Sequence, residues 1–436
     1  IGGLVYLPNA QNYTGTITQT VGTALTAGTL IGNGGILVVG QNGAMGADNN
    51  ISLRAGELRV GVNPLLSYTG TTDTQYGARN LYVKGGNAVF RTIALGGGQF
   101  GNVTMNTLTM RMDDADRGLT VNRIGTTFMN TIFTGATTLE NGTTARGAFF
   151  DVGDDNNFHS GLGNLVLNGV VGQTGTGAVS LQKRQGGGLI LNADNTYAGS
   201  TNVQQGRLVL GHVGAAGLAT STINLNTTND RRSDLEFRFD GAGPFVVNNV
   251  VATTGGNDNS TRVITVGSMN GSSSNQIVQI PTLTIGHAGT YATNGGVNSA
   301  VFFDGYNGYG LEVTGTLNIN RSIVLRTRGA VVTVSGVVAG AVANILEKSE
   351  QGTLWLSGNN TYAGPTVISQ GYLVAAHDNA FGTAVTDITF RNNLFSQVLA
   401  SGTRTINRNF INTATASDQT LGGLDAGVKT FSGGIN

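Results

Sequence analysis

The chain has 436 residues, of which 39% are hydrophobic and 11% charged, with 69 glycines, 5 prolines and no cysteine. This hydrophobic content excludes a disordered tail, and 24 basic against 24 acidic residues without long runs exclude the electrostatic footprint of a nucleic-acid-binding protein. No window approaches 18 uncharged apolar residues, so we expect no transmembrane segment.

The composition favours many short strands joined by many turns. Glycine and Asn accept the positive φ of tight turns, whereas Thr and Val favour strands. The absence of cysteine suits a protein that crosses membranes unfolded, and the low charge permits association into larger assemblies. Because the chain opens with Ile1 rather than Met, we expect its true beginning to lie upstream or to have been removed.

Apolar residues alternate with a period of two along the whole chain. The clearest strand segments are 108–110, 208–210, 235–239, 301–303 and 317–319. We find no stretch with apolar residues at helical spacing over three turns. The sequence therefore predicts an all-β protein with very little helix.

Two segments have nearly the same sequence: NADNTYAGSTNVQQGRLVLG at 192–211 and SGNNTYAGPTVISQGYLVAA at 357–376. Aligned on Tyr197 and Tyr362, they match without a gap over 183–217 and 348–382. The matching positions include Lys183 and Lys348, Leu189 and Leu354, Leu191 and Leu356, Gly199 and Gly364, Gly206 and Gly371, Leu208 and Leu373, and His212 and His377, with Leu210 at a further core position.

A looser third copy spans residues 3–46 around Tyr13 and Gly15. After an insertion of about 13 residues at the second turn, Gly35 takes the place of Gly206. Each copy is too small to bury its own apolar face, so we expect neighbouring copies to stack. The sequence predicts one continuous β-solenoid over 1–436 with roughly 22 residues per coil.

The repeated residue types suggest individual roles. Leucines of one parity point toward one core. Each repeat tyrosine covers a corner of the core while its hydroxyl stays in water. For each repeat lysine we favour a stem that covers an apolar corner with the ammonium in water, over a contact between coils or subunits. Trp355 lies between two inward leucines and is expected to point outward.

The repeat resembles the autotransporter-associated β-strand repeat of bacterial autotransporter passengers and of very long bacterial surface proteins. The resemblance covers about a quarter of the chain. It implies a right-handed parallel β-helix on the outer surface or outside the cell, exported through a separate C-terminal translocator. The family motif is architectural, so it brings no catalytic, cofactor-binding or metal-binding residue to this sequence.

The alignment also bears on both ends of the chain. The residue that would match Lys183 in the first copy falls just before Ile1, and FSGGIN at 431–436 is similar to the lead-in SGVVAG at 335–340. We therefore expect an internal or processed piece of a longer repetitive protein, or a subunit whose ends are completed by neighbours.

Two acidic clusters are candidates for chemistry. Asp113, Asp114 and Asp116 could supply paired carboxylates, as in sugar-cleaving β-helices, and Asp151, Asp154 and Asp155 could bind Ca²⁺. We favour solvated turns for both clusters, because the second matches no known calcium-loop spacing.

The histidines and one glycine-rich segment give only weak indications of a metal-binding or phosphate-binding site. His212 and His377 lack an acidic partner at fixed spacing, so we expect hydrogen bonds at a corner rather than metal binding. His159 and His287 are isolated. GGGQFG near residue 96 lacks the Lys-Ser/Thr ending of a phosphate-binding loop.

The function that fits best is a non-catalytic structural or adhesive surface protein without cofactors. We expect it to associate with itself through its solenoid ends by head-to-tail stacking into a fibre or sheath, and a surface polysaccharide or a host or cell-surface ligand is a further possible partner. The alternative is a carbohydrate-active β-helix, a polysaccharide lyase or hydrolase, and Thr-based ligand or ice binding ranks below it.

Overall fold

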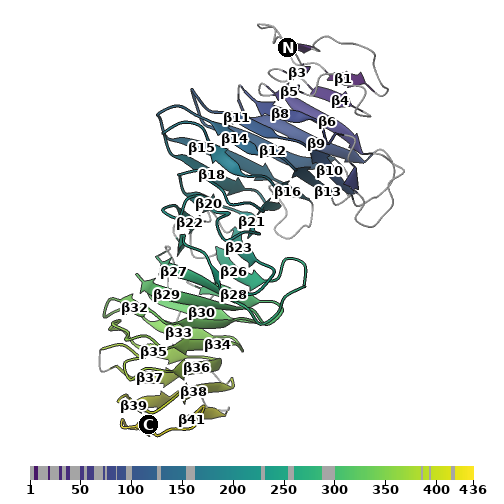
Figure 1. Cartoon of the computed structure of the whole chain (residues 1–436). Coiled ribbons are helices and arrows are strands. Elements are labelled where there is room, and N and C mark those ends of the chain that lie inside the picture. The colour runs from purple at the N-terminus through teal and green to yellow at the C-terminus, as the bar shows by residue number, and fades with distance from the viewer. Residues whose placement is uncertain are drawn as a thin grey trace. The chain divides into compact units, whose positions relative to one another are not determined.

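A computed structural model of the chain describes residues 4–7, 18–19, 29–31, 36–39, 50–53, 56–62, 72–73, 76–84, 86–94, 101–124, 129–153, 163–226, 231–253, 260–286, 300–383, 386–391, 394–413 and 418–436. Every regular element among them is a β-strand, as the alternation predicts, and all strand pairs for which a register is given are parallel (Figure 1). The chain divides into two compact units, Ile1–Ser221 and Thr222–Asn436.

The first unit is a coil whose turns pass through three sheets. Its first sheet contains β7 (Thr72–Asp73), β10 (Gly101–Met105), β13 (Met129–Phe133), β16 (Asn164–Leu167), β19 (Gly188–Leu191) and β21 (Gly206–Leu210). The second contains β2 (Thr18–Gln19), β3 (Thr29–Ile31), β5 (Asn50–Leu53), β8 (Asn80–Val83), β11 (Leu108–Arg111), β14 (Thr137–Glu140) and β17 (Val171–Gln173). The third contains β1 (Leu4–Leu7), β4 (Ile36–Val39), β6 (Glu57–Val62), β9 (Ala88–Ala94), β12 (Arg117–Ile124), β15 (Arg146–Val152), β18 (Val179–Arg184) and β20 (Thr201–Val203).

The second unit is also a coil of parallel strands, arranged in two long sheets and one short pair. One sheet contains β23 (Arg232–Arg238), β26 (Thr261–Gly267), β28 (Ala300–Gly305), β30 (Ile323–Thr327), β33 (Leu346–Ser349), β35 (Thr366–Ile368), β37 (Ile388–Phe390) and β40 (Phe410–Asn412). The other contains β22 (Thr222–Leu225), β24 (Phe245–Val246), β25 (Val250–Thr253), β27 (Ile277–Ile285), β29 (Gly310–Ile319), β31 (Val331–Val334), β32 (Val337–Gly340), β34 (Thr353–Leu356), β36 (Gly371–Ala375), β38 (Ser396–Ala400) and β41 (Gln419–Gly423). A short pair joins β39 (Arg404–Ile406) to β42 (Lys429–Phe431).

Columns of apolar side chains run through each unit at right angles to the strands. In the first unit Leu167, Leu191 and Leu210 occupy the same register on three successive strands, and none of them is exposed. Parallel pairing in register brings like residues from successive coils into contact, and such burial contributes about 1.5–3 kcal/mol for a leucine. The five predicted strand segments are confirmed, and Phe239, one residue beyond β23, is also buried.

Coil length varies far more than the expected value of about 22 residues. Ile132 pairs with Val166, 34 residues on, whereas Leu189 pairs with Leu208, only 19 residues on. Coil length can vary because the core requires only that the strands pair in register. Extra residues at a turn cost little closure entropy and stay at the surface.

The divergent copy at 3–46 has the strand register of the two full copies. β1 pairs with β4 so that Val5 faces Leu37 and Leu7 faces Val39, as Leu189 faces Leu208. The insertion therefore lies between two strands that still pair. Tyr13, Gly15 and Gly35 lie outside the described residues.

Candidate functional site

The two full repeats each contain a lysine on the core-facing side of a strand. Along β18 the buried positions are Val179, Leu181 and Lys183, and along β33 Leu346 and Lys348 are buried on the same parity. Neither lysine has any exposed surface. The same alternation that directs leucines inward therefore directs both ammonium groups inward.

The ammonium of Lys183 joins two consecutive coils. It donates hydrogen bonds to the carbonyl oxygens of Arg184 and Gln185, both at 2.6 Å, and of Gln205 at 3.1 Å. The first two carbonyls belong to the last residue of β18 and to the turn after it, and the third belongs to the turn after β20. An ammonium has three donors and no acceptor, so three converging carbonyls satisfy it.

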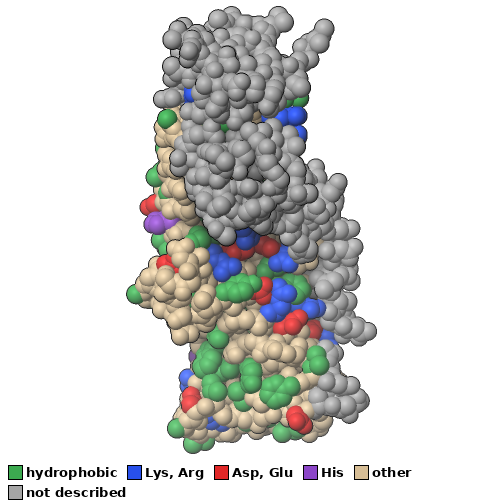
Figure 2. Space-filling view, turned by 90° about the vertical axis from the view of Figure 1, so that its right-hand side faces the viewer, with side chains coloured by type: hydrophobic (Ala, Val, Ile, Leu, Met, Phe, Trp, Pro, Cys, Tyr) green, Lys and Arg blue, Asp and Glu red, His purple; other side chains and the backbone are tan. Residues whose placement is uncertain are grey.

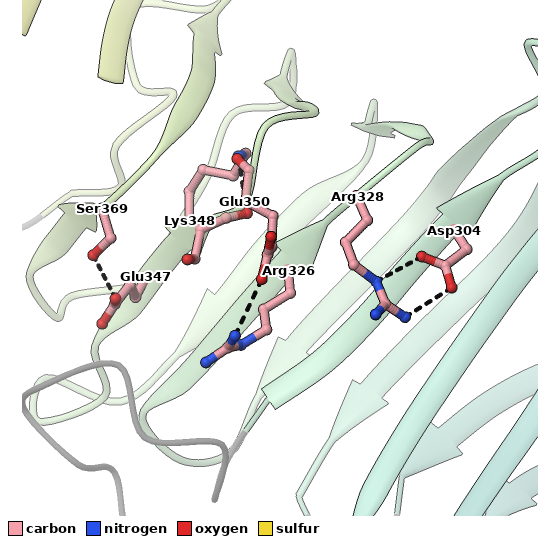
Figure 3. Close-up of polar contacts among 8 residues, drawn as sticks. Asp304, Arg326, Arg328, Glu347, Lys348, Glu350 and Ser369 are labelled. Carbon is pink, nitrogen blue, oxygen red and sulfur yellow. Dashed lines mark hydrogen bonds and ion pairs between the residues drawn. The ribbon is translucent and has the colours of Figure 1, made fainter. Parts of the chain in front are cut away.

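Lys348 repeats this arrangement in the second unit. Its ammonium donates to the carbonyl oxygens of Ser349 at 3.0 Å, Glu350 at 2.6 Å and Gln370 at 2.8 Å. Figure 3 shows the bond to Glu350. We call each ammonium with its three carbonyls a lysine clamp. A clamp ties the turn of one coil to the turn of the next through a single buried charge.

The expectation that the lysine ammonium stays in water was wrong. Two carbonyls just after the lysine and one from the next coil surround the ammonium, and the side chain has no surface exposed to water. Because burial disfavours the charged form, it lowers the pKa of Lys183 and of Lys348 to about 7.

The repeat glycines Gly206 and Gly371 make room for the clamps. Both have a positive φ, +74° and +79°, and a Cβ at either position would clash with the carbonyl oxygen of Gln185 or Glu350. Gln185 and Glu350 themselves have positive φ values of 63° and 67°. Their strained backbone turns the carbonyl toward the ammonium, which offsets part of the cost of that conformation.

The repeat tyrosines are fully buried, hydroxyl groups included. The hydroxyl of Tyr197 bonds Thr201 Oγ1 and that of Tyr362 bonds Thr366 Oγ1, both at 2.6 Å. The expectation of a solvated hydroxyl was wrong because a threonine four residues on supplies a partner inside the core. Burial also raises the pKa of both tyrosines well above the ordinary value.

The asparagine of the Asn-Thr-Tyr motif was not predicted as a site residue, although it is common to both repeats. Asn195 Oδ1 accepts the amide of Val171 at 2.7 Å, and its Nδ2 donates to the carbonyl of Ala215 at 2.6 Å. Asn360 makes the equivalent bonds to Val338 and to the Ala380 carbonyl, both at 2.7 Å. One buried side chain thus joins the coil before the repeat to the coil after it.

The remaining repeat positions lie in the core or against neighbouring backbone. The leucines at 189, 191, 208, 210, 354, 356 and 373 have no exposed surface. A Cβ at Gly199 or Gly364 would clash with the backbone of the preceding coil. These positions therefore serve close packing between coils.

Beside the second clamp lies a row of ion pairs (Figure 3). Glu347 is buried and accepts a hydrogen bond from Ser369 Oγ at 2.5 Å (Figure 3). It also accepts one from Arg391 at 2.8 Å. The equivalent position of the first repeat is Gln182, whose Oε1 accepts from Gln204 at 3.2 Å. The contact between coils is thus kept, while its charge differs between the repeats.

The acidic cluster at 113–116 is tied into ion pairs and a turn. Asp113 pairs with Arg111 at 2.6 Å, Asp114 pairs with Arg117, and Asp116 accepts a backbone amide of β15 at 2.8 Å. Each carboxylate has its own partner, as expected of a structural turn.

Asp151 of the second cluster forms a bidentate ion pair with Arg184 at 2.5 and 2.8 Å. Asp154, Asp155, His159 and His287 lie outside the described residues. Within the described part of the chain, no three or more acidic or histidine side chains gather as metal ligands would, and no helix has the length and apolarity to span a membrane.

The repeat histidines accept local hydrogen bonds at a corner, as predicted. His212 Nδ1 accepts the amide of Gly214 at 3.1 Å, and His377 Nδ1 accepts the amide of Asn379 at 3.0 Å. Both bonds close the turn that follows the repeat strands β21 and β36.

Comparison with known proteins agrees with this geometry. The passenger-associated-transport-repeat family matches residues 181–210 and 346–375, which contain the two clamps. The chain is also 39% identical over 61 residues to the Adhesin BmaC autotransporter of Brucella suis biovar 1 (strain 1330), a stretch that covers 14% of this chain and 2% of the adhesin. No solved structure matches the chain.

Proposed function

We propose that this chain, a parallel β-solenoid with two passenger-associated transport repeats, is a non-catalytic structural or adhesive segment of an autotransporter passenger at the bacterial surface or outside the cell. The observation that carries the proposal is the match of the transport repeat to the two segments closed by a lysine clamp. The likeness to an autotransporter adhesin supports it.

The chemistry of the repeats supports a structural role. Several polar side chains common to both repeats make bonds that join coils or close turns: the lysine, the asparagine, the tyrosine with its threonine, and the histidine. Hydrogen bonds of this kind contribute about 1 kcal/mol each, and more where one partner is charged. A side chain held in such bonds is not free to act on a substrate.

The finer part of the proposal is head-to-tail stacking into a fibre or sheath. Within each unit, coils join by parallel strand pairing, as in β36 on β38 and β15 on β18. The same pairing can join an edge strand of one copy to an edge strand of another. Electron microscopy of the purified protein tests this, because stacked copies form fibres with a strand spacing of about 4.8 Å. Dispersed single particles at high concentration would contradict stacking while leaving the solenoid intact.

Surface location is tested on intact cells that produce the full-length protein. Protease added to intact cells should remove the chain, detected by an antibody to it, while a cytosolic marker protein stays whole. In parallel, the purified chain should release no new reducing or unsaturated sugar ends from acidic or neutral polysaccharides. A protected chain would overturn the surface location, and sustained release of sugar ends would overturn the non-catalytic role.

A further inference from the structure

The outward face of β31, β34, β36 and β38 carries aromatic side chains on three consecutive coils. Leu354 and Leu356 point inward with no exposed surface, so Trp355 between them points outward, as predicted, and is half-buried. Tyr372 on β36 is also half-buried and outward. Phe395, next to the start of β38, is 44% exposed.

Two aliphatic side chains on β36 and β38 are covered. Val374, the register partner of Trp355, is only 2% exposed, and Leu399 beside it is 9% exposed. The rings of Tyr372 and Phe395 touch with centroids 5.7 Å apart at 73°. Figure 2 shows hydrophobic side chains gathered toward the lower end of one side of the molecule, below a mixed group of charged side chains. We call Trp355, Tyr372 and Phe395 the aromatic strip.

The surroundings of the strip are polar but uncharged. The cross-strand partners of Tyr372 are Thr353 and Gln397, and Trp355 faces Thr333 on its other side. Arginines on β30 and in the turns after β30 and β37 have carboxylate partners: Arg326 pairs with Glu350 at 3.1 Å, Arg328 with Asp304 at 2.8 Å and Arg391 with Glu347 at 2.8 Å. An anionic ligand would find no unneutralised arginine there, whereas hydroxyl groups would find amide and hydroxyl partners.

The strip is too small for a stable contact between two copies of the chain. Three aromatic side chains expose about 150–250 Å² each at most, and here all three are partly covered. A stable protein interface buries about 800 Å² on each partner. The exposed area instead fits a narrow ligand.

We propose that the aromatic strip binds an uncharged polysaccharide. The chain of sugar rings runs across the strands and packs its C–H faces on Trp355, Tyr372 and Phe395, while Thr353 and Gln397 bond sugar hydroxyls. The strip crosses the strands diagonally, because Trp355 is opposite Val374, two positions beyond Tyr372, and Tyr372 is opposite Gln397, two positions beyond Phe395. This proposal rests on the adhesive role proposed above, and it names the chemical class of the ligand that the chain would bind.

Trp355 is the only tryptophan in the chain, so its fluorescence reports directly on the strip. The experiment titrates the purified chain with soluble xyloglucan, galactomannan and dextran, and with heparin as the anionic comparison. At least one neutral polysaccharide should shift the Trp355 emission in a saturable way, and heparin should not. Tyr372→Ala and Phe395→Ala should each weaken that binding about tenfold or more, whereas Tyr306→Ala, at a 52% exposed tyrosine elsewhere in the second unit, should leave it unchanged.

Matching thermal melts of the four proteins show that the variants fold. The proposal is overturned if no neutral polysaccharide shifts the emission, if heparin alone does, or if Tyr372→Ala binds as tightly as the parent. It is also overturned if sedimentation shows a dimer that Trp355→Ala abolishes, because a second copy then occupies the strip. Each of these results leaves the surface location and the lack of turnover standing, while cleavage of a bound polysaccharide would overturn the proposed function instead.

Discussion

Lys183 donates a hydrogen bond to the carbonyl of Gln205, 22 residues further along the chain and one coil away. Lys348 does the same to Gln370. Only four of the 24 basic residues are lysine, and two of these four are in clamps. A lysine ammonium is a compact charge with three donors, whereas the planar fork of an arginine could not point at three carbonyls gathered around one point.

Replacement of the clamp lysines tests this relationship. Lys183→Met or Lys348→Met keeps the apolar stem but leaves three buried carbonyls without a donor, so we expect a loss of about 2 kcal/mol or more in the free energy of unfolding. Denaturant titration measures it. Lys84→Met, at a half-buried lysine that lies over Tyr82, is the control and should change little. A clamp variant as stable as the parent would show that the clamp contributes nothing.

Removal of a buried tyrosine hydroxyl should lower the free energy of unfolding by less than removal of a clamp lysine. Thr201 donates to the carbonyl of Ala216 at 3.0 Å, so the Tyr197 hydroxyl donates to Thr201. Tyr197→Phe removes this bond and should cost about 1 kcal/mol in the free energy of unfolding. Tyr306→Phe, at an exposed hydroxyl, should cost close to nothing. Equal denaturation midpoints for the two variants would contradict the prediction.

The glycines beside the clamps should not accept a side chain. Gly206→Ala places a Cβ against the Gln185 carbonyl at a φ of +74°, so we expect a loss of about 2 kcal/mol or more. Gly142→Ala is the matched control, because nothing lies within 4 Å of its Cβ position. Thermal melts of the two variants check the difference, and a tolerated Gly206→Ala would count against the close approach.

The contact that Asn195 makes between two coils can be tested at the backbone amide of Val171. Val171 donates its amide to Asn195, so Asn195→Ala should speed hydrogen exchange at Val171 by about 30-fold, for a lost contribution of about 2 kcal/mol. Asn192→Ala removes an exposed bond to Asn168 and serves as the control, with no change at Val171. Unchanged exchange in Asn195→Ala would mean that another group holds this amide.

Stability should depend on pH in two opposite ways. In the unfolded chain a lysine keeps its proton up to a pKa of about 10.4, whereas burial lowers the pKa of Lys183 and Lys348 to about 7. Between these values the unfolded chain binds more protons, so the free energy of unfolding rises with pH. Above about pH 10 the unfolded chain loses protons that buried Tyr197 and Tyr362 retain, so stability falls.

Denaturant titrations across this range should therefore show a maximum slightly above pH 10, about midway between the pKa values of the unfolded tyrosines and lysines. The double variant Lys183→Met with Lys348→Met should lose the rise and keep the fall. A parent protein whose stability is constant from pH 7 to 10 would show that the clamps stay protonated and contribute no pH dependence.

Much of the repeat could be predicted from alternation alone. The alternation of residues placed Leu189 and Leu191 in the core. The same alternation along residues 179–183 also points Lys183 inward. The prediction instead followed the usual preference of lysine for water, and so it missed the buried ammonium. The asparagine could have been found as well, because Asn195 and Asn360 are identical in both repeats. The prediction of one continuous solenoid over the whole chain stays a prediction.

The sequence by itself determined the strand periodicity, the inward leucines and the equivalence of the two repeats, because these depend on neighbours within a few residues. Only the tertiary structure decided the partners of Lys183, Tyr197 and Asn195. The carbonyl of Gln205 reaches Lys183 because a whole coil of 20 or so residues returns to the same place, and local sequence does not set the length of that path. A buried polar group is tolerated only where such a partner arrives.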